Sequence, residues 1–327
     1  MAMPQPLNIP GLSAGSQVRE TLLVLDVEQR TTGEGDPFTV LTVGNSTGSI
    51  ETGPFWLDRQ PMVAGVHRGH VAQVIGEVET YRDRPQLKVS SLNVLPSSGV
   101  DVRQLLPSVG AVDRYWETLD GWREEIRKPR LKAVVGLFYL DEDFRRLYEQ
   151  CPASIRGHHA AIGGLLKHTT EVAAIARTIA RACGADVELV LAGVLLHDIG
   201  KIEAYSWNGM FDFTPAGSLL GHVTLGAFML DRRMREEAGP PCTAGERDLL
   251  LHIVLSHHGR LEYGSPVLPM TLEAEVIHWA DNASARTSSV AEALASNGNF
   301  PAGDVSQRIR GMDGRRLFRG KADWGSA

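Results

Sequence analysis

Residues 195–201, "LLHDIGK", place His197 and Asp198 side by side at the end of an apolar run, with Lys201 three residues further on. A chain of 327 residues with eleven histidines has a fair chance of containing one such pair by accident. The alternative to a metal-binding role for His197 is ordinary hydrogen bonding at a helix end, where a cation interacts favourably with the helix dipole. The surrounding sequence has to distinguish these two interpretations.

Most of the other histidines gather around this pair. Nine of the eleven lie between positions 158 and 278, at intervals that often equal one helix and a loop. Helical bundles build metal sites from side chains that project inward from facing helices. Six side chains with this spacing are the candidate metal ligands, namely His168, His197, Asp198, His222, His257 and Asp281.

Residues 151–300 are predicted to form an all-α domain, because apolar residues recur at helical spacing over most of this range. Thr243 followed three residues later by Glu246 is typical of a capping box at the start of a helix. A histidine or aspartate on an apolar helix face is costly unless it is paired or coordinated. This cost favours the metal interpretation for His168 and Asp281.

The donor types indicate two divalent ions. Imidazole and carboxylate suit Mn, Fe, Co, Ni or Zn, with Mg as a further alternative. Six ligands are too many for one ion that keeps open positions, so we expect two ions bridged by Asp198. Two ions activate water and neutralise phosphate charge, and Lys201, one helical turn past Asp198, is placed to contact a phosphate oxygen. Asp198 and Lys201 are the candidate catalytic residues, although a solvated lysine is the ordinary alternative.

Two further histidines are assigned supporting roles. Adjacent residues on a helix point about 100° apart, so only one of His257 and His258 is expected to bind metal, and His257 is preferred. His258 then supports a ligand from behind or contacts the substrate. The same two roles are expected for His159.

Residues 1–100 have a different pattern. Short β-branched runs such as "TLLVLDVEQRT" and "GHVAQVIGEVETY" alternate apolar and polar residues and are separated by turn sequences. They predict five or so strands in an OB-like β-barrel. The fold class is therefore a multi-domain α and β protein, with the barrel followed by an all-α bundle. Residues 101–150 are interpreted as a helical connector, and the Arg/Gly-rich tail, 301–327, is expected to be extended or loosely ordered.

Composition limits the possible functions. A hydrophobic content of 43% is that of a soluble globular protein, and the length allows two domains. The net charge of −6 argues against coating nucleic acid through bulk charge, so any such contact is local. Cys151, Cys183 and Cys242 form no CxxC pair and fit a reducing cytoplasm. With neither an export leader nor a run of roughly 18 apolar residues, no membrane association is expected.

Several motifs in order along the chain resemble the HD-domain superfamily of metal-dependent phosphohydrolases. They are "HHAAIGGLLKHT", "LLHDIGK", "LLGHVTLG", "LSHHG" and "EAEVIHWADNASA". With the barrel-like first hundred residues, the chain more narrowly resembles the YhaM-type 3′-to-5′ exoribonucleases, which join an N-terminal OB domain to a C-terminal HD domain. The HD half is matched by specific motifs, and the barrel is matched by its pattern.

The resemblance implies a cytoplasmic, metal-dependent phosphodiesterase that hydrolyses single-stranded RNA from its 3′ end to nucleoside 5′-monophosphates. It favours Mn²⁺ and divides the ligands between two ions, with Asp198 shared. One ion takes His168, His197, Asp198 and Asp281, and the other takes Asp198, His222 and His257. Single-stranded DNA as an additional substrate and a homo-oligomeric state stay open.

Contacts to nucleic acid are assigned by local chemistry. Trp56 and Tyr81, each beside an arginine, are candidates for base stacking, with the barrel core or rim as the alternative. The connector sequence "REEIRKPRLK", 123–132, supplies candidate phosphate contacts, although a charge run is usually a solvated face. These candidates are Arg127, Lys128, Arg130 and Lys132.

Two other functions remain compatible with the sequence. One is an HD phosphohydrolase of nucleotides or cyclic dinucleotides in which the barrel serves assembly. The other is a nucleic-acid-binding protein with an inactive HD site, although a decayed site is expected to have lost at least one of its six ligands.

Overall fold

A computed structural model describes residues 6–81, 84–96, 101–236, 241–296, 299–300, 302–309 and 312–320. The chain divides into two compact units. The first comprises Met1–Val109 with Ser206–Asp212, and the second comprises Gly110–Tyr205 with Phe213–Ala327.

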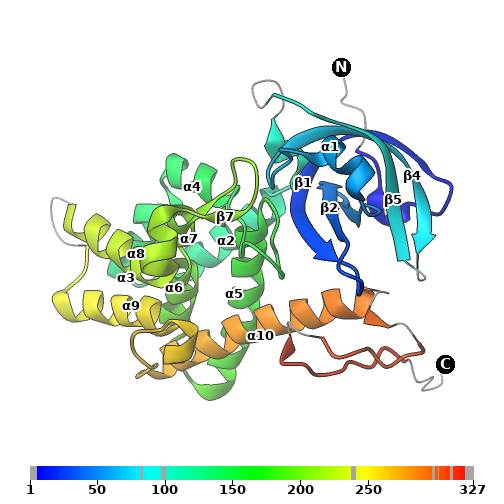
Figure 1. Ribbon diagram of the computed structural model, residues 1–327. Coiled ribbons are helices and arrows are strands. Elements are labelled where there is room, and N and C mark those ends of the chain that lie inside the picture. The colour runs from blue at the N-terminus through cyan, green and yellow to red at the C-terminus, as the bar shows by residue number, and fades with distance from the viewer. Residues whose placement is uncertain are drawn as a thin grey trace. The chain divides into compact units, whose positions relative to one another are not determined.

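The first unit is built on one five-stranded sheet, shown from blue to cyan in Figure 1. Its strands are β1 (Gln17–Thr31), β2 (Pro37–Asn45), β3 (Gly48–Glu51), β4 (Val71–Tyr81) and β5 (Arg84–Val94). They pair in the order β3-β2-β1-β4-β5, and every ladder is antiparallel. Short helices add η1 (Ile9–Gly11), η2 (Leu57–Arg59), α1 (Gln60–Val63) and η4 (Val102–Leu105). The predicted antiparallel β domain is confirmed.

The two edges of this sheet meet at one point. Thr52, directly after β3, forms a parallel bridge with Leu87 of β5, and the Gly53 amide donates to the Leu87 carbonyl at 2.9 Å. This strand order with one short parallel contact is that of an OB-like, partly open barrel. Inward-facing residues such as Leu41 and Phe55 are buried and form its core. Because the ring of Phe55 is buried, it cannot stack on a nucleic-acid base.

The second unit is helical, as the spacing of apolar residues predicts. Its helices are α2 (Asp113–Glu125), α3 (Pro129–Tyr139), α4 (Glu142–Tyr148), α5 (Gly164–Cys183), α6 (Val187–His197), α7 (Lys201–Ala204), α8 (Pro215–Glu236), α9 (Ala244–Ser256), η5 (Leu261–Tyr263) and α10 (Leu272–Ala295). The two short strands β6 (Tyr205–Ser206) and β7 (Asp212–Phe213) pair with each other. The predicted capping box is present, since Thr243 and Glu246 satisfy each other's backbone amides at the start of α9.

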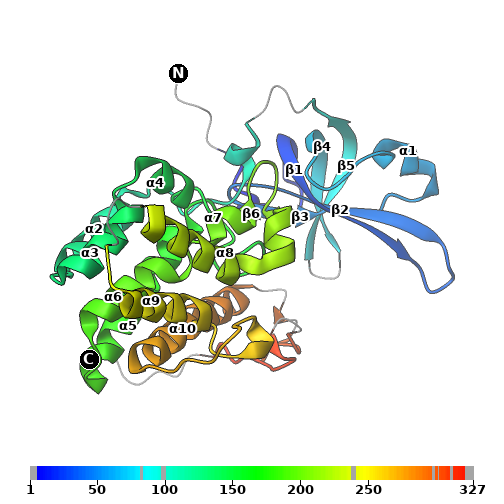
Figure 2. The same cartoon turned by 90° about the vertical axis from the view of Figure 1, so that its left-hand side faces the viewer.

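Helix α6 is the centre of this unit. It packs against α5, α9 and α10, whose labels lie beside and below its own in Figure 2. Asp186 caps its N-terminus by accepting from two backbone amides, and each residue from 190 to 197 is buried. Full burial of a leucine or valine side chain stabilises a fold by roughly 1.5–3 kcal/mol, so this apolar helix is held firmly. Its last residue, His197, is therefore fixed at the middle of the bundle.

The helices of the connector belong to the same core. Tyr139 of α3 is fully buried and donates a hydrogen bond from its hydroxyl to the Leu195 carbonyl of α6 at 2.9 Å.

In the C-terminal tail, Val305 pairs with Phe318 in an antiparallel bridge, and the Arg319 amide donates to the Asp304 carbonyl. The described part of the tail is thus held by backbone hydrogen bonds, which the sequence pattern does not predict.

All three cysteines are free. Among the described helices, none is both long and apolar enough to cross a membrane.

Candidate metal centre

The six predicted ligands come together inside the helical unit. They come from several helices of the bundle: α5 supplies His168, the end of α6 supplies His197 with Asp198, and α8 supplies His222. His257 follows α9 directly, and Asp281 lies in α10. The candidate ligand atoms form two groups, and within each group all the atoms lie within 4.8 Å of one another. The first group comes from His168, His197 and Asp198, and the second from His222, His257 and His258.

Asp198 lies between the two groups and turns one carboxylate oxygen to each. Its Oδ2 is 3.4 Å from His168 Nε2 and 3.2 Å from His197 Nε2. Its Oδ1 is 3.4 Å from His222 Nε2 and 3.6 Å from His257 Nε2. The carboxylate is 1% exposed, so protein groups surround it almost completely.

Asp281 joins the first group. Its Oδ1 is 3.0 Å from His168 Nε2, and its side chain is 16% exposed, more than that of Asp198. Asp281 therefore lies at the side of the cluster that is nearer to solvent.

The donor atoms fit metal ions. Across the part of the chain that the structure describes, buried side-chain nitrogens and oxygens without a well-formed hydrogen bond include both Asp198 oxygens and the Nε2 atoms of all four candidate histidines. Buried polar atoms are nearly always hydrogen-bonded, because an unpaired one costs about 1–3 kcal/mol. Six such atoms that face one another are explained by divalent ions between them.

The histidine tautomers point the same way. His197 Nδ1 lies 2.6 Å from the Val194 carbonyl, and His257 Nδ1 lies 2.7 Å from the Val254 carbonyl. A carbonyl only accepts, so each Nδ1 carries a proton, and in this tautomer the neutral ring would offer Nε2 to a metal. This is the arrangement by which proteins fix the ring of a metal-binding histidine.

The electrostatics keep these groups in their ligand forms. Burial lowers the pKa of His222 to about 3 and that of His257 well below its usual range, so both rings are neutral at physiological pH. Burial alone raises the pKa of Asp198, but the neighbouring His197 and Lys201 outweigh it and hold that pKa well below its usual range. Asp198 is therefore an anion at the centre of the cluster.

Lys201 makes the shortest contact with this anion. Its Nζ lies 2.6 Å from Asp198 Oδ2, and the residue is 6% exposed. Burial alone lowers the pKa of Lys201, but Asp198 outweighs it and the pKa lies above its ordinary value. Lys201 thus stays charged beside the oxygen that also faces His168 and His197.

Two glycines allow the backbone to bring His222 into place. Gly221 has φ +71°, a conformation that interrupts α8 one residue before His222 and that side-chain-bearing residues rarely adopt. At Gly200, a Cβ atom would lie 2.1 Å from the His222 carbonyl oxygen and 2.3 Å from the Gly226 nitrogen. The chain after Asp198 can therefore approach α8 only because residue 200 has no side chain.

A hydrogen-bonded chain supports His168 from behind. His168 Nδ1 lies 3.3 Å from Ser284 Oγ, Ser284 Oγ donates to Glu171 at 3.0 Å, and His159 Nε2 lies 2.8 Å from the same Glu171 oxygen. His159 thus contacts Glu171, which helps to hold the ring of His168 through Ser284. Sequence reasoning missed Glu171 and Ser284. A signal exists, because each lies three residues after a candidate ligand and so shares its helix face.

His258 lies beside the second group. Its Nδ1 donates to the Tyr263 carbonyl at 2.6 Å, and its ring centroid is 4.9 Å from that of His222. His257, which faces Asp198 directly, is 1% exposed, whereas His258 is half-buried. This arrangement suits a ligand role for His257 and a substrate-side role for His258.

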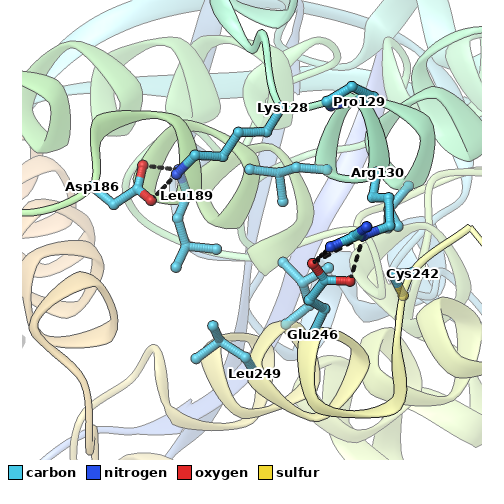
Figure 3. A pocket seen from close by; sticks show the side chains of 11 residues that line it. Lys128, Pro129, Arg130, Asp186, Leu189, Cys242, Glu246 and Leu249 are labelled. Carbon is cyan, nitrogen blue, oxygen red and sulfur yellow. Dashed lines mark hydrogen bonds and ion pairs between the residues drawn. The ribbon is translucent and has the colours of Figure 1, made fainter.

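The basic connector residues are engaged with acidic partners, as Figure 3 shows for two of them. Lys128 pairs with Asp186, Arg130 pairs with Glu246 at 2.7 Å, and Lys132 pairs with Glu124 at 2.6 Å. Arg127 is exposed, and its backbone amide donates to Glu188. Lys128 and Arg130 line a pocket of about 390 Å³ whose described lining includes none of the six clustered side chains.

The candidate stacking residues of the barrel are accessible. Trp56 is 41% exposed and lies 4.8 Å, between ring centroids, from Phe38. Tyr81 at the end of β4 is 55% exposed. Both side chains are thus partly exposed to solvent.

Comparisons with known proteins agree with these features. The HD domain family model matches residues 165–286. The chain is 28% identical over 308 residues to the 3′-5′ exoribonuclease YhaM of Bacillus subtilis (strain 168), covering 93% of this chain and 95% of that protein. It is 30% identical over 319 residues to the 3′-5′ exoribonuclease YhaM of Geobacillus sp. (strain WCH70), covering 93% and 92%. Among solved structures, the HD domain of the L. monocytogenes phosphodiesterase PgpH aligns with 40% of this chain and 68% of that chain at 24% identity, with a TM-score of 0.27.

Proposed function

Because the chain belongs to the YhaM family of 3′-5′ exoribonucleases, we propose that it shortens single-stranded RNA from the 3′ end and releases nucleoside 5′-monophosphates. The relatives match over nearly their whole length, so both units have counterparts in proteins that carry this name. We expect the protein to act in the cytoplasm, where its three free cysteines remain reduced.

The observation that carries this proposal is the position of Asp198 between two sets of histidines. One divalent ion would be held by His168, His197, Asp198 and Asp281, and a second by Asp198, His222 and His257. When bound, such ions lower the pKa of a coordinated water and neutralise the charge of phosphate oxygens. Mn²⁺ is our first choice, and Fe, Co, Ni, Zn or Mg ions are accepted by the same donor types.

The protein's own residues position the reaction. Asp198 holds the two halves of the cluster together, and its low pKa keeps it ionised. Lys201 is a buried cation beside the cluster, and we assign it to the negative charge that grows on the phosphate during hydrolysis. His258 is half-buried and lines a hollow together with Asp281, where it can contact the substrate.

The barrel is assigned to the RNA strand. Trp56 and Tyr81 present exposed rings, and a base stacked on such a ring contributes about 1–3 kcal/mol. The connector set Arg127, Lys128, Arg130 and Lys132 remains a weaker proposal, since three of its four side chains already have acidic partners.

The test is hydrolysis by the purified full-length protein in Mn²⁺ and then in other divalent ions. The substrates are 5′-labelled single-stranded RNA, the same sequence as DNA, a cyclic dinucleotide and a nucleoside triphosphate. We expect a ladder of 5′-labelled RNA products that shorten one nucleotide at a time, and no ladder with Asp198→Ala. Turnover of the small molecules without shortening of RNA would overturn the proposal and favour a nucleotide phosphohydrolase.

A further inference from the structure

A groove opens beside the candidate metal centre, and Asp281 and His258 are among its walls. It consists of two adjoining hollows of about 470 Å³ and about 450 Å³. Asp281 and His258 line the first hollow, so it reaches the cluster. Both hollows share Tyr263, His278, Asn282 and Arg286 as walls, and they therefore form one continuous channel.

One face of α10 forms the floor of this groove. His278, Asn282 and Arg286 are four residues apart along the helix, so their side chains lie in one row. The row passes Asp281 and leads away from it along the helix. A strand lying on this floor would bring a phosphodiester beside Asp281.

Two aromatic rings stand open in the groove. Trp279 is 53% exposed and Tyr263 is 48% exposed. The Trp279 indole is oriented by donating to Glu275 at 2.8 Å, and the Tyr263 carbonyl is fixed by His258. Oriented, exposed rings beside a phosphodiesterase centre have the chemistry of a base-stacking platform.

Arg286 supplies a cation that can be released to a phosphate. Its Nη1 lies 3.3 Å from Asp313, and the two side chains are 48% and 80% exposed. An exposed pair of this kind contributes about 0–1 kcal/mol, whereas arginine binds phosphate through two parallel hydrogen bonds. The other acids of the groove are engaged, since Glu275 accepts from Trp279 and Asp281 faces His168.

We propose that this groove holds the 3′-terminal nucleotides of single-stranded RNA, with bases stacked on Tyr263 and Trp279 and with Arg286 bound to a backbone phosphate in place of Asp313. The inference rests on the proposed function and adds a substrate-binding surface within the helical unit itself. It also assigns a role to the C-terminal tail, because Asp313 pairs with Arg286 in the absence of RNA.

The test compares Arg286→Ala and Trp279→Ala with matched controls in steady-state kinetics on a 5′-labelled RNA oligonucleotide in Mn²⁺. Arg232→Ala removes an exposed arginine that pairs with one glutamate, and Phe228→Ala removes an exposed ring on α8. We expect the KM of each groove variant to rise at least about fivefold, the loss of one stacked base or phosphate contact, with a smaller change in kcat. The controls should keep the wild-type KM.

Asp313→Asn separates a binding role of Arg286 from a structural one. If RNA replaces Asp313, removing that carboxylate should leave the KM unchanged or lower it, while Arg286→Lys should recover part of the loss in Arg286→Ala. If Asp313→Asn raises the KM as much as Arg286→Ala does, the pair is structural and the inference is wrong.

The outcome also distinguishes the two proposals. If wild-type protein shortens RNA but both groove variants match their controls, the groove inference fails and the proposed function stands. If wild-type protein does not shorten RNA, the proposed function fails, and the Kd for the same RNA in Ca²⁺, measured by fluorescence anisotropy, decides the groove. Unchanged Kd values in Arg286→Ala and Trp279→Ala then overturn it, and weakened binding supports it.

Discussion

Lys201 Nζ lies 2.6 Å from Asp198 Oδ2, the same oxygen that faces His168 and His197. Both members of this ion pair are almost completely buried. Removing one partner from a buried pair leaves an uncompensated charge in a poorly solvated place. The pair therefore couples the stability of the helical unit to the charge state of the proposed metal centre.

Lys201→Met should destabilise the metal-free protein by about 3–5 kcal/mol. Mn²⁺ should recover part of this loss, because the ions bring positive charge to Asp198. Urea unfolding in EDTA and in Mn²⁺ measures both effects. Lys132→Met, which breaks an exposed pair with Glu124, is the control and should cost about 1 kcal/mol or less. An equal loss of stability with and without Mn²⁺ would contradict the coupling.

Ser284→Ala should weaken metal binding by about 10–100-fold, because it interrupts the chain of hydrogen bonds that holds the ring of His168. Calorimetric titration with Mn²⁺ measures the change. Ser218→Ala, at an exposed position of α8, should bind Mn²⁺ as the wild type does. Equal Mn²⁺ affinity in both variants would show that Ser284 does not support the site.

Gly200→Ala should destabilise the helical unit by about 1–3 kcal/mol or more and should abolish hydrolysis. The added Cβ meets the His222 carbonyl at 2.1 Å, so the backbone that carries His222 has to move. Gly245→Ala is the matched control, since nothing lies within 4 Å of its Cβ position. Thermal unfolding and RNA hydrolysis report the two effects, and a stable, active Gly200→Ala would be inconsistent with the close packing described.

Glu246→Gln should lower stability at neutral pH, and the difference from wild type should shrink in acid. The Arg130 guanidinium, followed by the Thr243 amide, lowers the pKa of Glu246 from an ordinary 4.5 to about 2. Stability contributed by a carboxylate with a lowered pKa is complete above the unfolded pKa and is lost as the pH falls through the folded pKa. Urea midpoints between pH 7 and about pH 2 follow this change. Glu292→Gln, exposed on α10, is the control, and a difference for Glu246→Gln that is independent of pH would contradict the prediction.

Much of the fold and of the cluster was predictable because burial leaves strong patterns. Alternating residues in β1 and β4 indicate strands, and the apolar run of α6 indicates a buried helix. A histidine or aspartate inside such a run is costly unless it has a partner. Because of this cost, His168 and Asp281 could be predicted as metal ligands from the sequence alone.

Residues that depend on distant partners could not be predicted in the same way. Lys128 pairs with Asp186, 58 residues away, and Arg130 pairs with Glu246, 116 residues away. A run of basic residues has the same sequence pattern whether its side chains bind the phosphates of a ligand or pair with carboxylates of the same protein. The groove presents the same difficulty, because an exposed residue such as Trp279 carries no periodic signal.

The central claim is that one carboxylate, Asp198, is shared by two metal ions. Crystals of the Mn²⁺-loaded protein, measured at the manganese absorption edge, test it directly through anomalous scattering. We predict two peaks in contact with the Asp198 carboxylate, one beside His168 and His197 and the other beside His222 and His257. A single peak, or peaks that do not contact Asp198, would contradict the account.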